Sequence, residues 1–318
     1  MTTLAAVDCG TNSIRLLIQN TATGAEIVRQ MEIVRLGQGV DETGRFQPEA
    51  IERTRVALED YVEEMQRHEV EQVRMVATSA TRDAANRDEF FAMTAELLGR
   101  IQPSATAEVI SGEEEAALSF RGATVDLTGQ TSEANESSEP CCVIDLGGGS
   151  TEFVVETASG LHAASTQMGC VRLTERFMRS DPPTHTEQEA ARAYIRECIA
   201  EAQAQVPLDA VGTVVGCAGT FTTLSALAQG LYAYDPRAIH MSRIPFARMR
   251  EVTAEVRKTA ARIRAQHPVI HPGRADVLGA GAVVVEELMD VFERAGCGQF
   301  VISEKDILDG IIASLQRG

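Results

Sequence analysis

The chain has 318 residues, enough for two domains that each bury a core of their own. Its 29 basic and 46 acidic side chains leave a net charge of −17, which excludes strong nonspecific binding to nucleic acid or to acidic membranes. An apolar content of 44% and a charged content of 24% are typical of a globular protein. Because the chain has neither an apolar run of 18 residues nor a signal-peptide pattern, we expect a cytoplasmic protein.

The first half of the chain predicts the element order β-β-β-α-β-α-β-α. Apolar residues at helical spacing follow three strand-like runs, and two later apolar runs are bounded by turn residues. The predicted strands are 4–8, 13–20, 25–35, 73–77 and 106–110, and the predicted helices cover about 51–65, 87–99 and 111–121.

The second half repeats this order with additional helices. The predicted strands are 141–145, 151–156, 161–166, 211–216 and 298–302. The predicted helices lie near 170–179, 187–204, 246–264, 275–294 and 305–316, and a further helix follows Gly219-Thr220. Strands that alternate with helices predict an α/β protein with mixed sheets.

A polar, acidic segment without apolar periodicity separates the halves, from Thr128 to Pro140, and is typical of an exposed, mobile linker. We therefore expect a first domain over 1–127, a linker over 128–140 and a second domain over 141–318. The last helix, 305–316, is able to pack on the first domain.

Two copies of one acidic, glycine-containing turn lie 137 positions apart (145 − 8 and 150 − 13). Asp8-Cys9-Gly10-Thr11-Asn12-Ser13 matches Asp145-Leu146-Gly147-Gly148-Gly149-Ser150, since the aspartate, the first glycine and the serine recur at that offset. Each copy stands between two apolar runs, which predicts a strand, a tight turn and a second strand. Similarity at a fixed offset indicates a duplicated domain.

The turns have the composition of a phosphate site. Gly147-Gly148-Gly149 lets a ligand approach the backbone closely, so that successive N–H groups form a nest for an anion. Ser150 and Thr151 add hydroxyl donors, and Asn12 and Ser13 can do the same from the first copy. A single glycine turn is more often a plain hairpin. Two matched copies that face each other across a cleft would surround one phosphate with donors, so the repeat favours phosphate binding.

Three acidic residues accompany the turns. Asp8 and Asp145 each end the strand before a turn, and Glu152 follows the second turn. A carboxylate next to a bound phosphate is unfavourable unless a cation lies between them. Mg²⁺ fits this need, because it accepts one or two carboxylates and keeps waters and phosphate oxygens as further ligands. The alternative for the two aspartates is a capping role within the turns.

Two further groups are candidates from their positions alone. Arg82 follows the strand at 73–77 and a hydroxyl-rich turn, where it could grip phosphate or form a surface salt bridge with Asp83 or Asp88. Glu113-Glu114-Glu115 begins a helix, where acidic residues are favoured by the helix dipole in any case. At most one or two of these glutamates can face a cleft, and one that does could deprotonate a water for attack on phosphorus.

The remaining titratable residues exclude several chemistries. The seven cysteines form no CxxC pair and lie mostly in apolar segments, which indicates buried reduced thiols. No histidine stands in an HExxH or His-Asp pattern, and neither a Walker A sequence nor a nucleophile elbow is present. A basic stretch from Arg243 to Arg274 is either a solvated helix face or a surface that guides a polyanion.

Taken in order, these motifs resemble the exopolyphosphatase / guanosine-pentaphosphate phosphohydrolase (Ppx/GppA) family across nearly the whole chain. The matching segments are Asp8-Cys-Gly-Thr-Asn-Ser-Ile, Thr78-Ser-Ala-Thr-Arg82, Val109-Ile-Ser-Gly-Glu-Glu-Glu115, Val143-Ile-Asp-Leu-Gly-Gly-Gly-Ser-Thr-Glu152, Met168-Gly-Cys-Val-Arg-Leu173, Gly216-Cys-Ala-Gly-Thr220 and Ile302-Ser-Glu-Lys-Asp-Ile-Leu-Asp-Gly310. The chain resembles the short form of the family, which lacks the appended helical region of longer members.

The resemblance implies a duplicated actin-like, ribonuclease-H-like fold with the active site in the cleft between the halves. It also implies release of terminal phosphate from inorganic polyphosphate, with a divalent cation such as Mg²⁺ and a homodimeric assembly. The catalytic glutamate of the family matches Glu115, its acidic pair around the second turn matches Asp145 and Glu152, and its arginine matches Arg82.

Three other functions fit the same residues. Hydrolysis of the 5′-phosphate of pppGpp, which would link the protein to the stringent response, uses the same site and differs only beyond the terminal phosphates. An actin-like ATPase or sugar kinase would use the same fold. An alarmone-binding sensor with little turnover is a non-enzymatic alternative, which the presence of Glu115 disfavours.

Overall fold

The computed structural model describes residues 2–127 and 140–316, in two compact units. Unit 1 comprises Met1–Gly122 and Ile307–Gly318, and unit 2 comprises Ala123–Asp306. The C-terminal helix therefore belongs to the unit that the N-terminal residues form. The predicted linker, apart from Pro140, lies outside the described residues.

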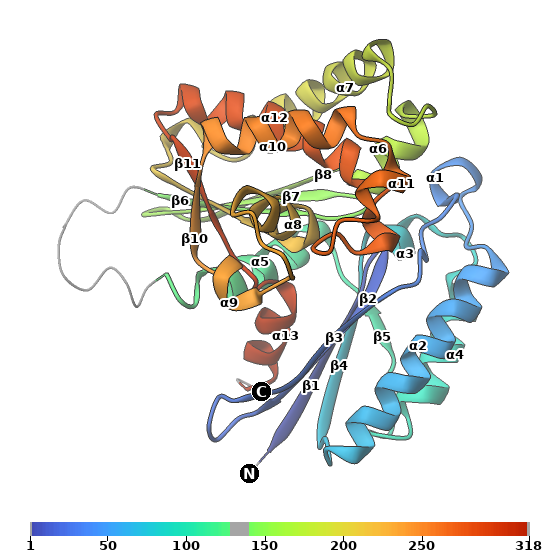
Figure 1. The fold of residues 1–318 in the computed structure, drawn as a ribbon. Coiled ribbons are helices and arrows are strands. Elements are labelled where there is room, and N and C mark those ends of the chain that lie inside the picture. Colours follow the sequence, from blue (N-terminus) through green and yellow to red (C-terminus); the bar gives the residue numbers. More distant parts are fainter. Residues whose placement is uncertain (1, 128–139, 317–318) are drawn as a thin grey trace. The chain divides into compact units, whose positions relative to one another are not determined.

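Unit 1 is a five-stranded sheet in the order β3-β2-β1-β4-β5, with helices on both faces (Figure 1). Its strands are β1 (Thr3–Cys9), β2 (Ser13–Asn20), β3 (Glu26–Ile33), β4 (Gln72–Ala77) and β5 (Ala107–Val109). Its helices are α1 (Val40–Thr43), α2 (Pro48–Arg67), α3 (Ser79–Asp83), α4 (Arg87–Leu98), α5 (Gly112–Thr124) and α13 (Ile307–Leu315).

The sheet of unit 1 separates two apolar clusters, since alternate residues of a strand point to opposite faces. One cluster joins β1 residues such as Val7 to Leu58 and Tyr61 of α2 and Phe90 of α4. The other joins β1 residues such as Ala6 to α5 and α13. At Gly310 the two helices come so close that a Cβ would lie 2.0 Å from the carbonyl oxygen of Leu118.

Unit 2 is built on a six-stranded sheet in the order β10-β11-β9-β6-β7-β8. Its strands are β6 (Cys141–Leu146), β7 (Thr151–Thr157), β8 (Gly160–Thr166), β9 (Thr213–Cys217), β10 (Ser242–Pro245) and β11 (Gln299–Ile302). Its helices are α6 (Cys170–Phe177), α7 (His185–Gln203), α8 (Ala218–Ala228), α9 (Pro236–Ile239), α10 (Phe246–Lys258), α11 (Ala261–Arg264) and α12 (Leu278–Arg294), with short 3-10 turns at η1 (Leu208–Ala210) and η2 (Pro272–Arg274). The long helix α12 packs against α6, α7, α8 and α10 and carries much of the core.

The two sheets share one topology. In unit 1, β1 pairs antiparallel with β2 and parallel with β4, which pairs parallel with β5. In unit 2, β6 pairs in the same way with β7 and β9, and β9 with β11. This correspondence confirms the predicted α/β fold and the duplication. Unit 2 adds β10, which was not predicted, as an antiparallel edge strand beside β11.

One predicted helix is divided in the structure. The segment 246–264 forms α10 and the single turn α11, with Thr259 and Ala260 in extended conformations between them. The carboxylate of Asp181 accepts the N–H of Ala261 at 2.8 and 3.0 Å and so begins the second helix. Asp181 is about 80 positions away, which is why helical spacing did not reveal the break.

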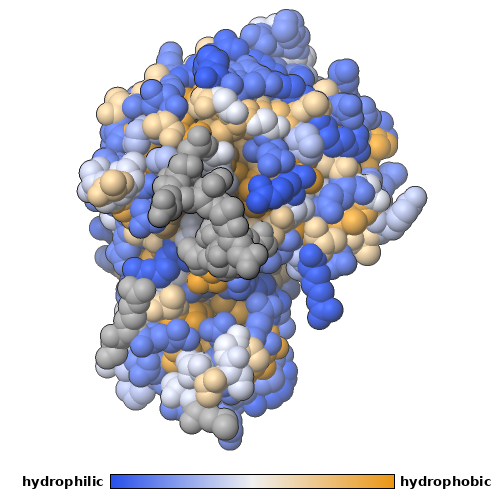
Figure 2. All heavy atoms as spheres, turned by 90° about the vertical axis from the view of Figure 1, so that its left-hand side faces the viewer, coloured by the Kyte–Doolittle hydropathy of each residue, from blue (hydrophilic) through white to orange (hydrophobic). Residues whose placement is uncertain are grey.

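The surface agrees with the acidic composition. On the face shown in Figure 2, hydrophilic residues predominate, and apolar residues appear as small patches. Within the described residues, no helix combines the length and the apolar character that crossing a membrane requires. The surface therefore offers no sign of a large apolar docking face in this view.

Candidate phosphate and metal site

The two predicted turns have the same backbone geometry. In the unit 1 turn, residues 10–13, the N–H of Gly10 donates to the carbonyl of Ser13 at 2.9 Å. In the unit 2 turn, residues 147–150, the N–H of Gly147 donates to the carbonyl of Ser150 at 3.1 Å. Each turn follows the carboxyl end of the central strand of its sheet, β1 or β6. The repeat in the sequence is thus a repeat in structure.

The carbonyl groups of the three glycines in the unit 2 turn are held from one side. The start of α6 supplies the donors: the N–H of Cys170 to Gly147 at 3.0 Å, of Val171 to Gly148 at 2.8 Å, and of Gly169 to Gly149 at 3.3 Å. Peptide N–H and C=O groups point in opposite directions, so the N–H groups of the turn are directed away from α6.

These N–H groups are available to a ligand. Within residues 2–127 and 140–316, no group accepts a hydrogen bond from the N–H of Gly148, Gly149 or Ser150. Three successive donors beside a glycine backbone form the anion nest that the sequence predicts. Burial of such donors without a partner is unfavourable, which itself favours a bound anion.

The unit 1 turn is supported in the same manner by the loop after β3. The carbonyl of Asn12 accepts the N–H groups of Val34 and Arg35 at 3.1 and 2.9 Å, and that of Thr11 accepts the N–H of Gly37 at 2.9 Å. No described residue accepts from the N–H of Thr11 or Asn12. Asn12 and Ser13 are partly exposed, as a role in binding requires.

The acidic residues beside the two turns have different partners. Asp8, 5% exposed, accepts from Arg15 Nε at 3.0 Å and Nη2 at 2.6 Å on its Oδ2 atom. At the equivalent register position in unit 2, the residue opposite Asp145 is Glu152. Unit 2 thus has two buried carboxylates on neighbouring strands where unit 1 has an ion pair.

The donors of unit 2 fit a small divalent cation. Asp145 and Glu152 are directly opposite each other, so their Cβ atoms lie roughly 5 Å apart, and like charges in this arrangement repel. Ser165 donates its hydroxyl to Glu152 Oε1 at 2.7 Å and orients that carboxylate. Among the described residues, no group of three or more His, Cys, Asp or Glu side chains forms a complete metal site. Two carboxylates completed by water and phosphate are what Mg²⁺ commonly uses.

Arg82 and Glu115 contact each other in unit 1. Arg82 Nη1 donates to Glu115 Oε2 at 2.8 Å and to the carbonyl of Ile110 at 3.0 Å. Glu115 is the buried member of the glutamate triplet, whereas Glu113 and Glu114 are exposed. A guanidinium at this distance favours the ionised carboxylate, which is the form a general base needs.

Unit 1 collects its candidates at one edge of its sheet. β1, β4 and β5 are parallel, so their carboxyl ends lie on the same side. The unit 1 turn follows β1, Arg82 follows β4, and Glu115 follows β5 within one turn of α5. Ligand sites of open α/β sheets lie at this edge.

Thr151 does not fit its predicted role. It is fully buried, and its hydroxyl donates to the carbonyl of Met168 at 2.9 Å, which uses its one proton. Thr151 therefore ties β7 to the loop before α6, and we leave it out of the phosphate donors proposed below. Ser150, 2% exposed, has no such bond among the described residues.

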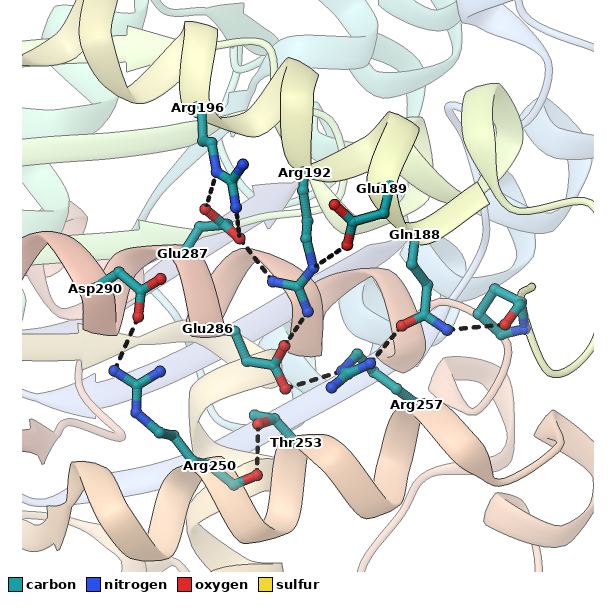
Figure 3. A network of polar contacts seen from close by, with 11 residues as sticks. Gln188, Glu189, Arg192, Arg196, Arg250, Thr253, Arg257, Glu286, Glu287 and Asp290 are labelled. Carbon is teal, nitrogen blue, oxygen red and sulfur yellow. Dashed lines mark hydrogen bonds and ion pairs between the residues drawn. The ribbon is translucent and has the colours of Figure 1, made fainter. Parts of the chain in front are cut away.

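Two arginines of the basic stretch pair with acidic residues of α12 (Figure 3). Arg257 donates to Glu286 at 2.9 Å, and Arg250 contacts Asp290 at 2.9 Å and Glu293 at 2.7 Å. These pairs place part of the stretch inside a network between α7, α10 and α12. They weaken the alternative of a polyanion-guiding surface.

Comparison with known proteins agrees with the motifs. The Ppx/GppA phosphatase family matches residues 17–316. "Exopolyphosphatase 2" of Mycobacterium tuberculosis is 53% identical over 322 aligned residues, which cover 99% of each protein. The chain belongs to the Ppx/GppA phosphatase family.

Solved structures of Ppx/GppA proteins share its fold. An exopolyphosphatase-like protein has a TM-score of 0.88 at 40% identity and covers 99% of each chain. The Aquifex aeolicus member of the Ppx/GppA family has a TM-score of 0.75 at 28% identity and covers 99% of this chain and 98% of that one. The duplicated actin-like α/β fold is thereby confirmed.

Two features of this Ppx/GppA chain were missed in the sequence. Arg15 and Glu152 obey the offset of 137 (152 − 15), so extending the repeat by two residues would have paired them. Gly37 and Gly169 each follow a buried apolar residue after the third strand and pack against a turn. The apolar residue followed by glycine, Leu36-Gly37 and Met168-Gly169, recurs in both halves and could have revealed this packing from the sequence.

Arg274 was not predicted as a site residue either. A Cβ on Gly219 would lie 1.9 Å from Nη1 of Arg274, so the guanidinium rests against the start of α8, which directly follows β9. In topology, α8 corresponds to α3, the short helix that carries Arg82 after β4. Ala218 has a φ of 67°, a strained conformation that recurs at ligand sites. Sequence spacing gave no signal, because Arg274 is more than 50 positions from Gly219.

Proposed function

We propose that this Ppx/GppA protein is an exopolyphosphatase that releases terminal orthophosphate from inorganic polyphosphate. The observation that carries the proposal is Glu115, a buried carboxylate held by Arg82 at the sheet edge where the unit 1 turn lies. The 53% identity to a protein named exopolyphosphatase supports polyphosphate as the substrate.

The reaction needs one proton acceptor. The carboxylate of Glu115 takes a proton from water while the water oxygen forms a bond to the terminal phosphorus. The bridging P–O bond breaks, and its electron pair leaves with the shortened polyphosphate. Orthophosphate and a chain shorter by one unit are the products. No protein nucleophile is required, because phosphoryl transfer depends on positioning and charge stabilisation.

The other site residues hold the phosphate oxygens. N–H groups of both turns, with the side chains of Asn12, Ser13 and Ser150, donate to them, and Arg82 adds a guanidinium. Asp145 and Glu152 would hold a divalent cation, which neutralises negative charge on the phosphates when it is bound.

Replacement of Glu115 by glutamine tests the proposal directly. We expect Glu115→Gln to lower the rate of phosphate release by about 10²–10⁴-fold, while polyphosphate still binds, because the shape of the side chain is kept and only the base is lost. Glu113→Gln is the matched control, since Glu113 lies on the same helical turn and is exposed. Phosphate release with Mg²⁺ and polyphosphate binding are the two measurements. Normal turnover in Glu115→Gln would refute the role of this residue.

Initial rates on polyphosphate, pppGpp and ATP test the substrate. We expect polyphosphate to be hydrolysed fastest. A higher rate on pppGpp would reassign the protein to alarmone hydrolysis, and a higher rate on ATP would reassign it to an actin-like ATPase. Tight alarmone binding without release of phosphate from any of the three would indicate a sensor.

The homodimer, the cytoplasmic location and a link to the stringent response stay predictions. Light scattering of the purified chain checks the first, and a dimer is the expected result. A higher rate of hydrolysis on pppGpp than on polyphosphate would support the link to the stringent response.

A further inference from the structure

The chain passes between its two units twice, and one ion pair joins the two passages. The boundaries lie after Gly122, near the end of α5, and after Asp306, directly before α13. Asp126 follows the end of α5 and Lys305 precedes the start of α13, and both residues belong to unit 2. Lys305 Nζ lies 2.7 Å from Oδ2 of Asp126. The end of one helix is thus tied to the start of the other.

His240, which follows α9, adds a second bond to the same carboxylate. Its Nδ1 accepts the N–H of Glu304 at 3.2 Å, so the ring proton is on Nε2 and is donated to Oδ2 of Asp126 at 3.0 Å. Although desolvation opposes the change, hydrogen bonds from Lys305 and His240 hold the pKa of Asp126 below its ordinary value. The carboxylate is therefore charged at neutral pH and keeps both donors. We call Asp126, His240 and Lys305 the crossing clamp.

A second contact joins the same two helices within unit 1. At Gly310 of α13, a Cβ would lie 2.0 Å from the carbonyl oxygen of Leu118 of α5, so the two helix backbones touch there. Leu118 belongs to the same apolar cluster as Ile311 of α13. Leu118 also lies about one helical turn after Glu115 (118 − 115 = 3). The helix that begins with Glu115 is therefore attached to the α13 segment at two separate points.

Two attachments restrain a helix more than one does. About a single close contact α5 can roll or slide, and a small displacement of a reacting group is costly, since catalysis depends on its alignment. The side chains of Asp126 and Lys305 are 39% and 35% exposed, so their ion pair adds little to the stability of the whole protein. Its removal should therefore loosen α5 without unfolding the chain.

We propose that Asp126 is a positioning residue for Glu115, because the crossing clamp fixes the end of α5 to the start of α13. The inference rests on the proposed function, in which Glu115 is the base. Asp126 acts through α5, and its loss changes how often Glu115 is aligned rather than its chemistry.

Replacement of either partner of the ion pair tests the inference through kcat. We expect Asp126→Asn to lower kcat about three- to fivefold with KM within about twofold, because one partly exposed ion pair can shift a two-state equilibrium by that factor. Lys305→Met should have the same effect. The double variant should be no slower than either single variant, since all three lose the same attachment. Lys305→Arg keeps the charge and should retain most of the wild-type kcat.

Glu251→Gln is the matched control. Glu251 pairs with Arg248 at 2.7 Å, but both residues belong to α10, so the pair ties no second segment. Its kcat should equal that of the wild type. Thermal melting confirms that each variant is folded. The comparison uses whichever of polyphosphate, pppGpp and ATP the wild type hydrolyses fastest, so a substrate other than polyphosphate would contradict the proposed function and leave the inference standing.

Hydrogen–deuterium exchange of the full-length protein, without any phosphate, measures the clamp independently of activity. We expect the amides of α5 to exchange about three- to fivefold faster in Asp126→Asn than in the wild type or in Glu251→Gln. Unchanged exchange in folded Asp126→Asn would overturn the inference. Faster exchange with an unchanged kcat would overturn it as well, because the clamp would then hold α5 without aligning Glu115. Additive losses of kcat in the double variant would also contradict a single shared attachment.

Discussion

Two buried glutamates, one in each unit, have the same exposure and the same kind of partner but different surroundings. Glu115 and Glu286 are both 8% exposed, and both bind arginine. Glu115 stands at the start of α5, directly after β5. Glu286 lies in the middle of α12, where Arg192 of α7 and Arg257 of α10 bind its two oxygens (Figure 3).

The comparison teaches that a buried ion pair does not by itself indicate a site. Glu286 and its neighbour Glu287 join three helices, and each of their carboxylates is bound by two arginines. Glu115 shares its sheet edge with a turn in which the N–H groups of Thr11 and Asn12 have no acceptor among the described residues. The two glutamates differ in that backbone N–H groups without an acceptor lie at the sheet edge of Glu115, and such groups favour an anion as ligand.

Loss of Arg82 should lower activity far more than it lowers stability. We expect Arg82→Ala to lower kcat/KM for polyphosphate about a thousandfold, or about 4 kcal/mol, because a cation beside the reacting phosphate and the partner of Glu115 are lost together. Arg74→Ala is the control. Arg74 has a similar exposure, 18% against 21%, and binds Glu114, the residue before Glu115. An equal loss in both variants would show that the pairing on α5 is structural.

Loss of Glu286 should affect stability rather than activity. We expect Glu286→Gln to lower the free energy of unfolding by about 3 kcal/mol, because Arg192 and Arg257 would keep buried charges with fewer partners. Its kcat/KM should stay within about twofold of the wild-type value where the protein is folded. Glu293→Gln, whose carboxylate is exposed and binds Arg250, should cost under about 1 kcal/mol. Urea denaturation measures both variants, and a selective loss of activity in Glu286→Gln would contradict the comparison.

Most of the fold could be predicted from the sequence, because its strands are short apolar runs between glycine or polar turns. The offset between the two turns predicted the duplication that both sheets show. β10 was missed because Ser242–Pro245 contains an arginine and a proline and pairs only at a sheet edge. The break after α10 depends on the distant Asp181, which no local pattern contains.

The candidate site was predictable in its residues but less so in their pairing. Glycine, serine and aspartate at fixed spacing predicted both turns, since turn chemistry is local. The contact of Arg82 with Glu115 joins segments 33 positions apart and was not foreseen, since the sequence offered phosphate or a nearby aspartate as the partner of Arg82. The pairing of Asp8 with Arg15 is set by strand register, and Arg250 and Arg257 of the basic stretch pair with residues of α12. These contacts depend on tertiary packing.

Gly169→Ala tests whether Glu115 is sufficient for activity when the unit 2 turn is distorted. A Cβ on Gly169 would lie 2.2 Å from the carbonyl carbon of Gly148, so the turn must move. Since φ at Gly169 is −82°, the backbone itself would accept alanine, and the effect is steric. We expect a loss of about 1–3 kcal/mol in stability and about a hundredfold loss in kcat/KM. In Gly37→Ala the closest atom is a side-chain methyl of Thr11, which can rotate, so a smaller loss is expected.

Cys170 extends the comparison to a buried thiol for which the cost of burial outweighs the effect of a nearby arginine. It begins α6 beside the unit 2 turn, a position that favours a thiolate, yet burial raises its pKa to about 11 although Arg274 opposes the shift. A raised pKa means that the thiol stays neutral through pH 9, with about a hundredfold less thiolate than an exposed cysteine. We expect no iodoacetamide labelling of Cys170 at pH 8.5, and labelling only on unfolding. A cysteine introduced at the exposed position of Ser159 should be labelled within minutes. Equal labelling of both cysteines would show that the start of α6, which holds the unit 2 turn, opens readily in the native protein.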